Sequence, residues 1–367
     1  MSLVEAVQAV LDVKNNKGHI MELRKLEKEE HSKTRELYER VFVQDTKEFL
    51  DYYYSVKTKD NEIYVIEEDE KIVSMIHLNP YQLRIGETIH PTNYIVAVAT
   101  DANYRKRGLM GQLLKHTMRE MYERKEPFTF LMPAAEAIYY PYDFRIVYTR
   151  KQGEMRGENN DSAVEIRVAA KEDCGKLVSF SNDFLKDYQV VAQRDEAYFE
   201  MMLAEQSSQD GGIVIMEKQE QIVGMFFYAK GERYEIREPL YHDEKDFKKA
   251  VYRFKKSEEE IVDTIAYGEG TRPIIMVRIL HLETFLKTIK LEADLDCYIK
   301  LEDAFISDNN GVFHVSGCAG QYISEVSRVT ENQIKEDIRN IPLWKMGDLT
   351  IEIFKQAFPK VFLNEVV

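Results

Sequence analysis

The chain has 367 residues, a length that predicts two or three domains at roughly 100–200 residues each. With 44% hydrophobic and 31% charged residues, it has the composition of a folded globular protein, which excludes disordered and fibrous classes. Its formal net charge of −14 repels phosphate backbones and anionic lipid, so we expect no binding to nucleic acid or to a membrane surface.

The sequence also indicates a compartment. The longest strictly apolar run, residues 94–99, is far shorter than the about 20 residues that a membrane helix needs. Residues 1–20 lack the basic leader of a secretion signal, and we interpret them as an N-terminal extension of a cytoplasmic protein. The cysteines show no CxxC spacing, so we expect neither a disulfide framework nor a metal site.

The first predicted region combines helices and strands. In chain order, the hydrophobic periodicity predicts helices over 32–42 and 46–54, a hairpin over 63–75, strands over 82–90 and 94–100, a helix with apolar positions from 110 to 121, and a strand over 128–132. Gly86 marks a turn within the strand over 82–90. This mixture predicts an α/β (α+β) fold.

The rest of the chain opens in the same way and then changes. A strand over 164–168, helices over 173–187 and 195–204, and a second hairpin over 213–225 are predicted. After Pro273 follow a strand and a helix, short strands over 296–301 and 311–315, and helices over 331–340 and 349–358. We expect a third, smaller α+β domain here.

The two hairpins resemble each other in sequence. Residues 63–75 (IYVIEEDEKIVSM) and 213–225 (IVIMEKQEQIVGM) are identical at six of thirteen positions, at a constant offset of 150 residues. Such a repeat predicts two domains of one fold. A chance similarity between two hairpins is the alternative.

The strongest local signal is a basic loop that contains glycine. Arg105, Lys106 and Arg107 are followed by Gly108 and Gly111, in a protein that is negative overall. Glycine lets the backbone approach a ligand, and the free N–H groups at the start of the next helix suit a pyrophosphate. The loop therefore predicts an anion site, with a solvated basic helix end as the alternative. Neither a Walker loop nor a dinucleotide fingerprint is present.

This loop also carries a family resemblance. Residues 105–111 (RKRGLMG), between a strand and an amphipathic helix, resemble the acyl-CoA signature R/Q-x-x-G-x-G/A of GNAT-type N-acetyltransferases. Met110 is a departure, because the signature ends in a small residue. The layout of residues 21–367 and the motif at 132–144 (MPAAEAIYYPYDF) are similar to the enhanced intracellular survival (Eis) acetyltransferases in particular.

The resemblance implies a domain organisation. Residues 21–157 would form a catalytic GNAT domain and residues 158–272 a degenerate GNAT-like domain. Residues 273–367 would form a sterol-carrier-protein-like α+β domain. The fold expected is thus a tandem GNAT pair followed by this smaller domain.

The resemblance further implies which residues bind acetyl-CoA. The pantetheine arm would lie along the strand before the loop, the diphosphate would lie on the loop, and a Ser-Glu pair of the family corresponds here to an Ala-Glu pair, which lacks the hydroxyl. The implied cofactor-binding residues are Val98, Ala99, Thr100, Arg105, Lys106, Arg107, Gly108, Leu109, Met110, Gly111, Ala135 and Glu136.

Two catalytic groups are implied as well. Tyr139 fits the family's I-Y-x-x-[FY]-x-[FY] pattern, in which the tyrosine is the general acid. Counting from Glu136 instead would give Tyr140, so both stay candidates. The family's base is the C-terminal carboxylate, here that of Val367, although a terminus is usually a free and mobile tail.

The second hairpin provides an internal control. Advancing 150 residues from the basic loop leads to residues 253–261 (RFKKSEEEI), which contain no glycine and three consecutive glutamates. A diphosphate would not bind there, so we expect one cofactor site per chain.

We therefore expect an acetyl-CoA-dependent N-acetyltransferase that acts on a primary amine of a cationic substrate such as an aminoglycoside, a polyamine or lysine. No GxSxG nucleophile elbow is present, which favours direct attack in a ternary complex. The resemblance implies a homo-oligomer, a hexamer. The alternative is a non-catalytic protein that binds acyl-CoA or lipid on a degenerate acetyltransferase scaffold.

Overall fold

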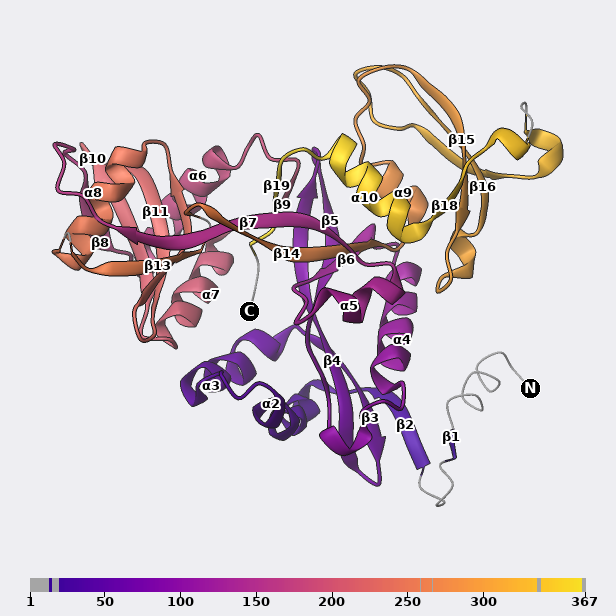
Figure 1. Cartoon of the computed structure of the whole chain (residues 1–367), viewed down its shortest axis with the longest axis horizontal. Coiled ribbons are helices and arrows are strands. Elements are labelled where there is room, and N and C mark those ends of the chain that lie inside the picture. Colours follow the sequence, from indigo (N-terminus) through magenta and orange to yellow (C-terminus); the bar gives the residue numbers. More distant parts are fainter. Residues whose placement is uncertain (1–12, 15–19, 258, 266, 335–337, 365–367) are drawn as a thin grey trace.

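The computed structural model describes residues 13–14, 20–257, 259–265, 267–334 and 338–364. The chain forms three lobes, coloured indigo to magenta, pink to orange, and orange to yellow in Figure 1. Strands and helices alternate in the first two, which confirms the mixed α/β class expected from the sequence. Within the described residues, no helix is long and apolar enough to cross a membrane.

The first lobe begins with two strands and two helices and ends with a strand that extends to the second lobe. Its elements are β1 (Val13–Lys14), β2 (Ile20–Lys25), α2 (Arg35–Val41), α3 (Lys47–Ser55), β3 (Glu62–Glu68), β4 (Lys71–Ile85), β5 (Thr88–Thr100), α4 (Leu109–Glu123), β6 (Phe128–Leu131), α5 (Glu136–Tyr139) and β7 (Arg145–Arg156). Helix α3 begins as predicted because the Thr46 side chain accepts a hydrogen bond from the Phe49 N–H at 3.2 Å.

The elements of the second lobe repeat most of this order, with an added strand between the first two helices and no counterpart of β1 or α5. They are β8 (Glu165–Val168), α6 (Cys174–Phe184), β9 (Val190–Ala192), α7 (Glu196–Ser207), β10 (Gly212–Lys218), β11 (Gln221–Lys230), β12 (Tyr234–Tyr241), α8 (Glu244–Lys255), β13 (Ile261–Ile265) and β14 (Gly270–Ile279). The third lobe contains α9 (Leu282–Leu286), β15 (Leu295–Glu302), β16 (Gly311–Gly317), β17 (Glu325–Val329), β18 (Leu343–Lys345) and α10 (Met346–Ala357). The chain then returns to the large sheet, where β19 (Val361–Phe362) pairs with β9.

Both predicted hairpins are confirmed, as β3–β4 and β10–β11. Asp69 and Glu70 have φ values of 51° and 65°, and Gln219 and Glu220 have φ values of 49° and 64°. Positive φ at both central residues is the type I′ turn, which matches the twist of the strands it joins. Each hairpin also carries a register shift at the same place, after Ile66 in the first and at the corresponding residue of the second. The sequence repeat is thus a structural repeat.

Strands β7 and β14 join the first two lobes into one sheet. They pair antiparallel with each other, β14 also pairs with β6 of the first lobe, and β7 also pairs with β13 of the second. The strand order is β1-β2-β3-β4-β5-β6-β14-β7-β13-β12-β11-β10-β8. Each lobe therefore completes its sheet with a strand from the other, and the two strands run between the lobes in Figure 1.

The pairing of β14 within the large sheet corrects the domain boundary expected at residue 273. Residues 276–279 pair with 128–131 of β6, so the segment after Pro273 belongs to the large sheet instead of opening a third domain. The periodicity correctly indicated a strand followed by a helix, α9, but it contains no information about the partner of that strand.

Two further expectations differ from the structure. The strand over 82–90 is not a separate element, because β4 continues through Pro80 to Ile85 and turns at Gly86, which has φ of 62°. The helix over 331–340 is replaced at its two ends by the 3-10 helices Glu331–Gln333 and Ile338–Asn340.

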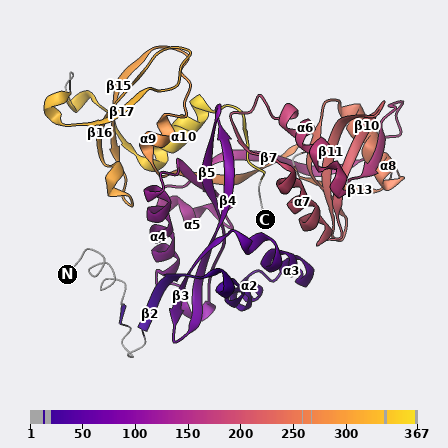
Figure 2. The same ribbon diagram turned by 180° about the vertical axis from the view of Figure 1, so that it is seen from behind.

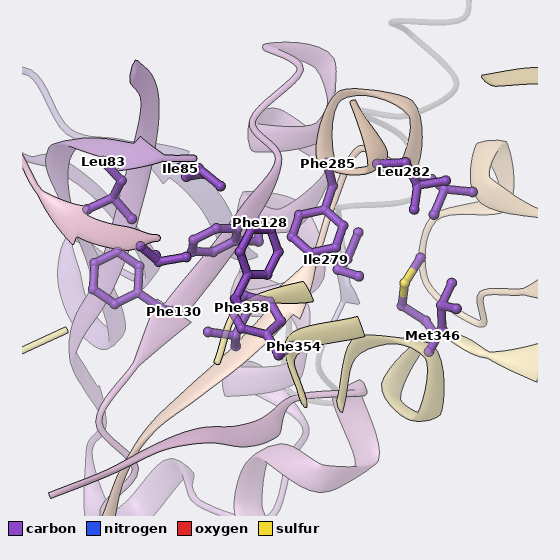
Figure 3. Close-up of a cluster of buried hydrophobic side chains, with 14 of the residues drawn as sticks. Leu83, Ile85, Phe128, Phe130, Ile279, Leu282, Phe285, Met346, Phe354 and Phe358 are labelled. Atoms are coloured by element: carbon purple, nitrogen blue, oxygen red, sulfur yellow. The ribbon is translucent and has the colours of Figure 1, made fainter. Parts of the chain in front are cut away.

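The third lobe is anchored on the large sheet by aromatic packing. Phe354 lies against Phe128 and Phe285, with ring centroids 5.6 Å apart in both pairs, and Phe358 lies 5.4 Å from Phe354. Figure 3 shows these rings meeting between β6, α9 and α10. The four-stranded sheet β17-β16-β15-β18 extends outward from this contact.

Candidate active site

Strand β5 separates from β6 partway along its length. The two strands pair in parallel only at residues 94–95 with 130–131. Just beyond, Ala97 has φ of 50° and the register between β4 and β5 shifts. A bulge of this kind bends a strand and leaves backbone groups outside the ladder. The edge of Val98, Ala99 and Thr100 that faces away from β4 is therefore open to a ligand.

The loop after β5 is fixed at its first residue. Asp101 is buried, and its carboxylate accepts a hydrogen bond from the Asn103 N–H at 3.0 Å. It also forms ion pairs with Arg40 at 3.0 Å and Lys71 at 3.3 Å. The backbone hydrogen bond, together with these cations, holds the pKa of Asp101 below its usual value. These contacts thus fix the first residue of the loop at the end of β5.

The three basic side chains of the loop are exposed. Arg105 donates from Nε to the carbonyl of Thr100 at 3.2 Å, and Arg107 donates to the carbonyl of Asn103 at 3.1 Å. The Arg107 guanidinium also lies 4.7 Å from the Tyr104 ring centroid. Short contacts of this kind keep the positive charge of Arg105 and Arg107 close to the end of β5.

The backbone then turns into α4 through a left-handed conformation. Lys106 and Gly108 have φ values of 64° and 77°, and Leu109 begins the helix. The first N–H groups of a helix have no partner within it, and they carry the positive end of the helix dipole. Exposed cations and free N–H groups together form the geometry that a diphosphate requires.

Gly111 has a different neighbour from the one expected. It is buried, and a Cβ at this position would clash with the Tyr142 hydroxyl. The glycine therefore makes room for a tyrosine of the same lobe. The place of Gly111 among the cofactor-binding residues stays a prediction, and a Cβ at Gly108 would meet nothing within 4 Å.

The Ala-Glu pair lies at the start of α5. Ala135 is exposed and adopts an extended N-cap conformation, and its carbonyl accepts a hydrogen bond from the Ile138 N–H at 3.1 Å. Glu136 is half-buried. Among the described residues, no hydrogen bond or ion pair joins either residue to the basic loop, so their role as cofactor contacts stays a prediction.

The two tyrosine candidates lie in different environments. Tyr139 is 7% exposed and packs in the cluster that contains Leu109 of α4 and Ile95 of β5. Burial raises its pKa to about 12, so its hydroxyl is protonated at neutral pH. Tyr140 is 42% exposed, and its ring lies under the Arg145 guanidinium at 4.9 Å. The two candidates thus differ in burial, and the choice of Tyr139 as the acid stays a prediction.

A cavity of about 350 Å³ lies between the first two lobes. It is lined by Gln44, Asp45, Thr46, Phe49, Tyr81 and Met132 of the first lobe, Tyr198, Met202, Glu205, Gln206, Gln209, Phe227, Glu235, Arg237, Glu238 and Ile265 of the second, Arg150 and Arg272 of the joining strands, and Asn364. Helices α3 and α7 face each other beside it, and Tyr52 donates a hydrogen bond to Glu205 at 3.2 Å. Figure 2 shows both helices from behind.

Four carboxylates line this cavity, and those of Glu235 and Glu238 lie in close ion pairs. Arg237 lies 2.5 Å from Glu235, and Arg194 lies 2.5 Å from Glu238. Glu205 is buried, and burial raises its pKa although the charge of Lys57 acts in the opposite direction. Asp45 and Glu205 are therefore the two cavity carboxylates considered further as contacts for a bound cation.

Asp45 has a polar partner without charge. It accepts a hydrogen bond from the Tyr38 hydroxyl at 3.0 Å, and no ion pair is found for it within the part of the chain that the structure describes. Burial raises its pKa. Sequence reasoning missed Asp45 and Glu205, because each lies at the end of a predicted helix, and only the packing of two lobes brings them to one cavity.

The C-terminal segment reaches the same cavity. β19 pairs in parallel with β9, Leu363 is fully buried, and Asn364 lines the cavity while accepting a hydrogen bond from the Tyr148 hydroxyl at 3.4 Å. The default of a free tail is thus wrong for residues 361–364. Val367, the expected base, lies outside the described residues.

The second lobe has the same opening but a different loop. β12 pairs with β13 only at 235–237, and Glu238 next to it has φ of 46°. Only His242 and Asp243 separate β12 from α8, and the Asp243 side chain accepts a hydrogen bond from the Lys245 N–H at 2.7 Å. The residues expected to correspond to the basic loop, 253–261, lie instead at the far end of α8 and beyond. The offset has already fallen from 150 to 141 at the bulge residues Ala97 and Glu238, and the shorter loop reduces it further.

A family model supports this reading of the first lobe. Residues 22–147 match the model described as an acetyltransferase (GNAT) domain. No curated protein matches the chain significantly. No group of three or more His, Cys, Asp or Glu residues that could hold a metal ion is found among the described residues.

Solved structures share the fold of almost the whole chain. A probable N-acyltransferase from Enterococcus faecalis has a TM-score of 0.76 at 17% identity, covering 92% of this chain and 90% of that chain. Eis1 from Mycobacterium abscessus has a TM-score of 0.63 at 11% identity, covering 92% and 89%. The N-myristoyltransferase of Saccharomyces cerevisiae with bound myristoyl-CoA has a TM-score of 0.50 at 11% identity, covering 70% and 82%.

Proposed function

Because residues 22–147 form an acetyltransferase domain of the GNAT family, we propose that this chain transfers the acetyl group of acetyl-CoA to a primary amine of a cationic substrate. The observation that carries the proposal is the open edge of β5 followed by the basic turn into α4. It offers backbone N–H groups to a pantetheine arm and positive charge to a diphosphate within one continuous segment, 98–111.

The proposed reaction is a direct transfer. The neutral amine attacks the thioester carbonyl carbon, the C–N bond forms, the C–S bond breaks, and one proton passes from the amine to the departing sulfur. Tyr139 is the proposed acid, and its pKa of about 12 keeps a donor available toward the sulfur. Since a thiol has an ordinary pKa of about 8.5, we propose that hydrogen bonding to the sulfur precedes full proton transfer.

For the base we propose the C-terminal carboxylate of Val367. The burial of Asn364 at the cavity supports this assignment, because it brings the last described residue of the tail between the two lobes. A carboxylate there would orient the amine and accept its proton directly or through water.

The cavity is the proposed binding site of the amine substrate. Asp45 and Glu205 provide carboxyl groups, and Phe49, Tyr81 and Phe227 provide rings of the kind that contact cations favourably. Because Asp45 is partly buried without a cationic partner in the described chain, a bound ammonium group would stabilise its charged form. This chemistry fits aminoglycosides, polyamines and lysine alike.

Tyr139→Phe tests the proposal. It removes the proposed donor and keeps the ring, and we expect thiol release from acetyl-CoA with a panel of amines to slow by about 10²–10⁴. The affinity for CoA, measured by calorimetry, should be retained. Tyr140→Phe is the matched control and should turn over like the unmodified protein. The opposite pattern would assign the role to Tyr140.

The same thiol-release assay distinguishes the proposed enzyme from the alternative, a non-catalytic binding protein. A non-catalytic protein that binds acyl-CoA or lipid would bind CoA in the calorimeter and release no thiol with any amine.

We further propose a cytoplasmic homo-hexamer, with the third lobe as a sterol-carrier-protein-like domain after the tandem GNAT pair. Sedimentation of the full chain measures the assembly.

A further inference from the structure

A buried ion pair lies where β14 meets the third lobe. The side chains of Arg278 and Asp303 are fully buried, and Nη2 of Arg278 lies 2.6 Å from Oδ1 of Asp303. Burying two charges costs desolvation that their attraction often only balances, and apolar residues of similar volume frequently stabilise a fold as well or better. Stability alone therefore gives little reason for charge at this position.

Arg278 uses its remaining donors on the backbone. Nε donates to the carbonyl of Tyr142 at 3.0 Å, and Nη1 donates to the carbonyl of Ile279 at 2.9 Å. Tyr142 ends the 3-10 turn Tyr140–Tyr142, which continues directly from α5 and therefore from Tyr139. The last carbonyls of a helical segment have no partner within it. Arg278 satisfies one of them at the end of the segment that carries the proposed acid.

Asp303 is held in place by the third lobe. Its Oδ1 accepts hydrogen bonds from the backbone N–H groups of Phe305 at 2.9 Å and Ile306 at 3.0 Å, and its Oδ2 accepts one from Asn309 at 2.9 Å. The carboxylate thus has a fixed direction, which in turn fixes the guanidinium of Arg278.

Tyr142 is also held through its ring. The ring lies 5.4 Å from that of Phe305, and the hydroxyl lies beside Gly111 in the first turn of α4. The segment that follows Tyr139 is therefore enclosed between the helix of the basic loop and the third lobe, with Arg278 fixing its backbone.

We infer that Arg278 is a positioning residue for Tyr139, and that Asp303 orients Arg278 for this task. The inference rests on the proposed function, in which the Tyr139 hydroxyl faces the sulfur of acetyl-CoA. It assigns the third lobe a part in catalysis, because the direction of the guanidinium comes from a carboxylate in that lobe. A small displacement of a reacting group is enough to slow a reaction by about a hundredfold.

Arg278→Lys tests this inference. Lysine keeps a positive charge opposite Asp303 but lacks the planar fork that reaches both Asp303 and the Tyr142 carbonyl. We expect kcat to fall about tenfold, with the KM for acetyl-CoA and the CoA affinity unchanged. If this variant does not fold, Arg278→Met combined with Asp303→Asn leaves no unpaired buried charge, and the same loss of kcat is expected.

The distinguishing measurement is a double-mutant cycle with Tyr139→Phe. If Arg278 acts through the Tyr139 hydroxyl, Arg278→Lys should have almost no effect in the Tyr139→Phe background. A purely structural role would lower kcat equally in both backgrounds and would overturn the inference alone. Normal turnover by Tyr139→Phe, or no turnover by the unmodified protein with any amine, would overturn both the inference and the proposed function.

Asp308→Asn is the matched control. Asp308 forms an ion pair with Arg119 of α4, so it joins the same two regions as Asp303 does, but both side chains are 44% exposed and neither contacts Tyr142 in the described contacts. We expect its kcat to equal that of the unmodified protein. A loss as large as that of Arg278→Lys would overturn the inference, since any link between α4 and the third lobe would then suffice.

Discussion

The first two lobes share their strands up to the point where a cofactor would bind and differ beyond it. Each has a type I′ hairpin, a bulge, and a strand that separates from its parallel neighbour, β5 in one lobe and β12 in the other. In the first lobe, residues 101–108 then form a basic loop with Gly108 at a φ of 77°. In the second, two residues suffice, and Asp243 caps the helix.

The comparison separates what the fold provides from what the loop provides. The bulge and the open strand edge exist in both lobes, so they are properties of the fold. Positive charge and helix N–H groups without a side-chain cap occur together in the loop of the first lobe, whereas an aspartate side chain occupies the corresponding N-terminus in the second. A diphosphate site therefore depends on this loop, and we expect one CoA per chain in calorimetry.

The largest effect is expected from Gly108→Asp. A Cβ at this position meets nothing within 4 Å, and Asp tolerates a positive φ, so the fold should persist. A unit charge about 5 Å from a phosphate costs roughly 3 kcal/mol at an effective dielectric constant near 20, which lowers CoA affinity more than a hundredfold. Gly108→Asn has the same shape without the charge and should keep most of the affinity. Equal affinities of the two variants would contradict the loop assignment.

His77→Phe places in the first lobe the residue that the second lobe has at the equivalent position. That residue is Phe227, which follows the register shift in β11 as His77 follows the shift in β4. Burial lowers the pKa of His77 to about 3 from an ordinary value near 6.5. The folded state therefore binds fewer protons than the unfolded state between these values, and stability falls as the pH drops below about 6.5.

The expected loss for the unmodified protein is about 2 kcal/mol between pH 8 and pH 5 from this residue. His77→Phe removes this loss, although it costs about 1–2 kcal/mol at pH 8, because the Tyr53 hydroxyl loses its partner at 2.9 Å. Denaturant unfolding at both pH values measures the difference. Parallel changes in the two proteins would show that His77 does not titrate as described.

Adding residues after Val367 tests whether the C-terminal carboxylate acts as the base between the first two lobes. Residues 362–364 are buried and Asn364 lines the cavity, so a short C-terminal tag would displace the proposed base from a confined cavity. We expect the acetylation rate to fall at least about tenfold while the melting temperature and CoA affinity barely change. An N-terminal tag is the control and should be tolerated. Full activity of the C-terminally tagged protein would leave water or Glu136 as the base.

The smallest effect is expected from Asp243→Ala in the second lobe. It removes the side-chain cap of α8, which costs about 1 kcal/mol of unfolding free energy. CoA affinity and turnover should not change, because the second lobe holds no cofactor in this proposal. A change in CoA stoichiometry would indicate that the second lobe takes part in binding.

The local elements of this fold could be predicted from the sequence, but their long-range partners could not. Alternation and turn residues indicated both hairpins, and helical periodicity of apolar residues indicated the helix after the basic loop. The periodicity of residues 274–279 indicated a strand, yet pairing with β6 depends on a backbone more than a hundred residues away. The constant offset of 150 failed before the loop, because Glu238 of β12 corresponds to Ala97 of β5 at an offset of 141, and the shorter loop reduces it further.

In the site, too, local features could be predicted from the sequence and long-range contacts could not. The basic loop could be found because its charge and glycine follow one another in the chain. The Arg278–Asp303 pair and the acidic groups of the cavity could not, because neither a lone arginine in a strand nor an acid at a helix end differs locally from a surface residue. Burial distinguishes them, and burial here comes from contacts between lobes.

The exchange of β7 and β14 has a consequence for synthesis of the chain. When β6 (Phe128–Leu131) leaves the ribosome, the strand that completes its sheet, β14 (Gly270–Ile279), has not yet been made. At roughly 5–20 residues per second, residues 132–279 take about 7–30 s to synthesise. During that time the nascent first lobe carries an unpaired apolar strand edge, which is a template for aggregation. The first lobe therefore reaches its native sheet only after the second has been translated, and the two lobes mature as one unit.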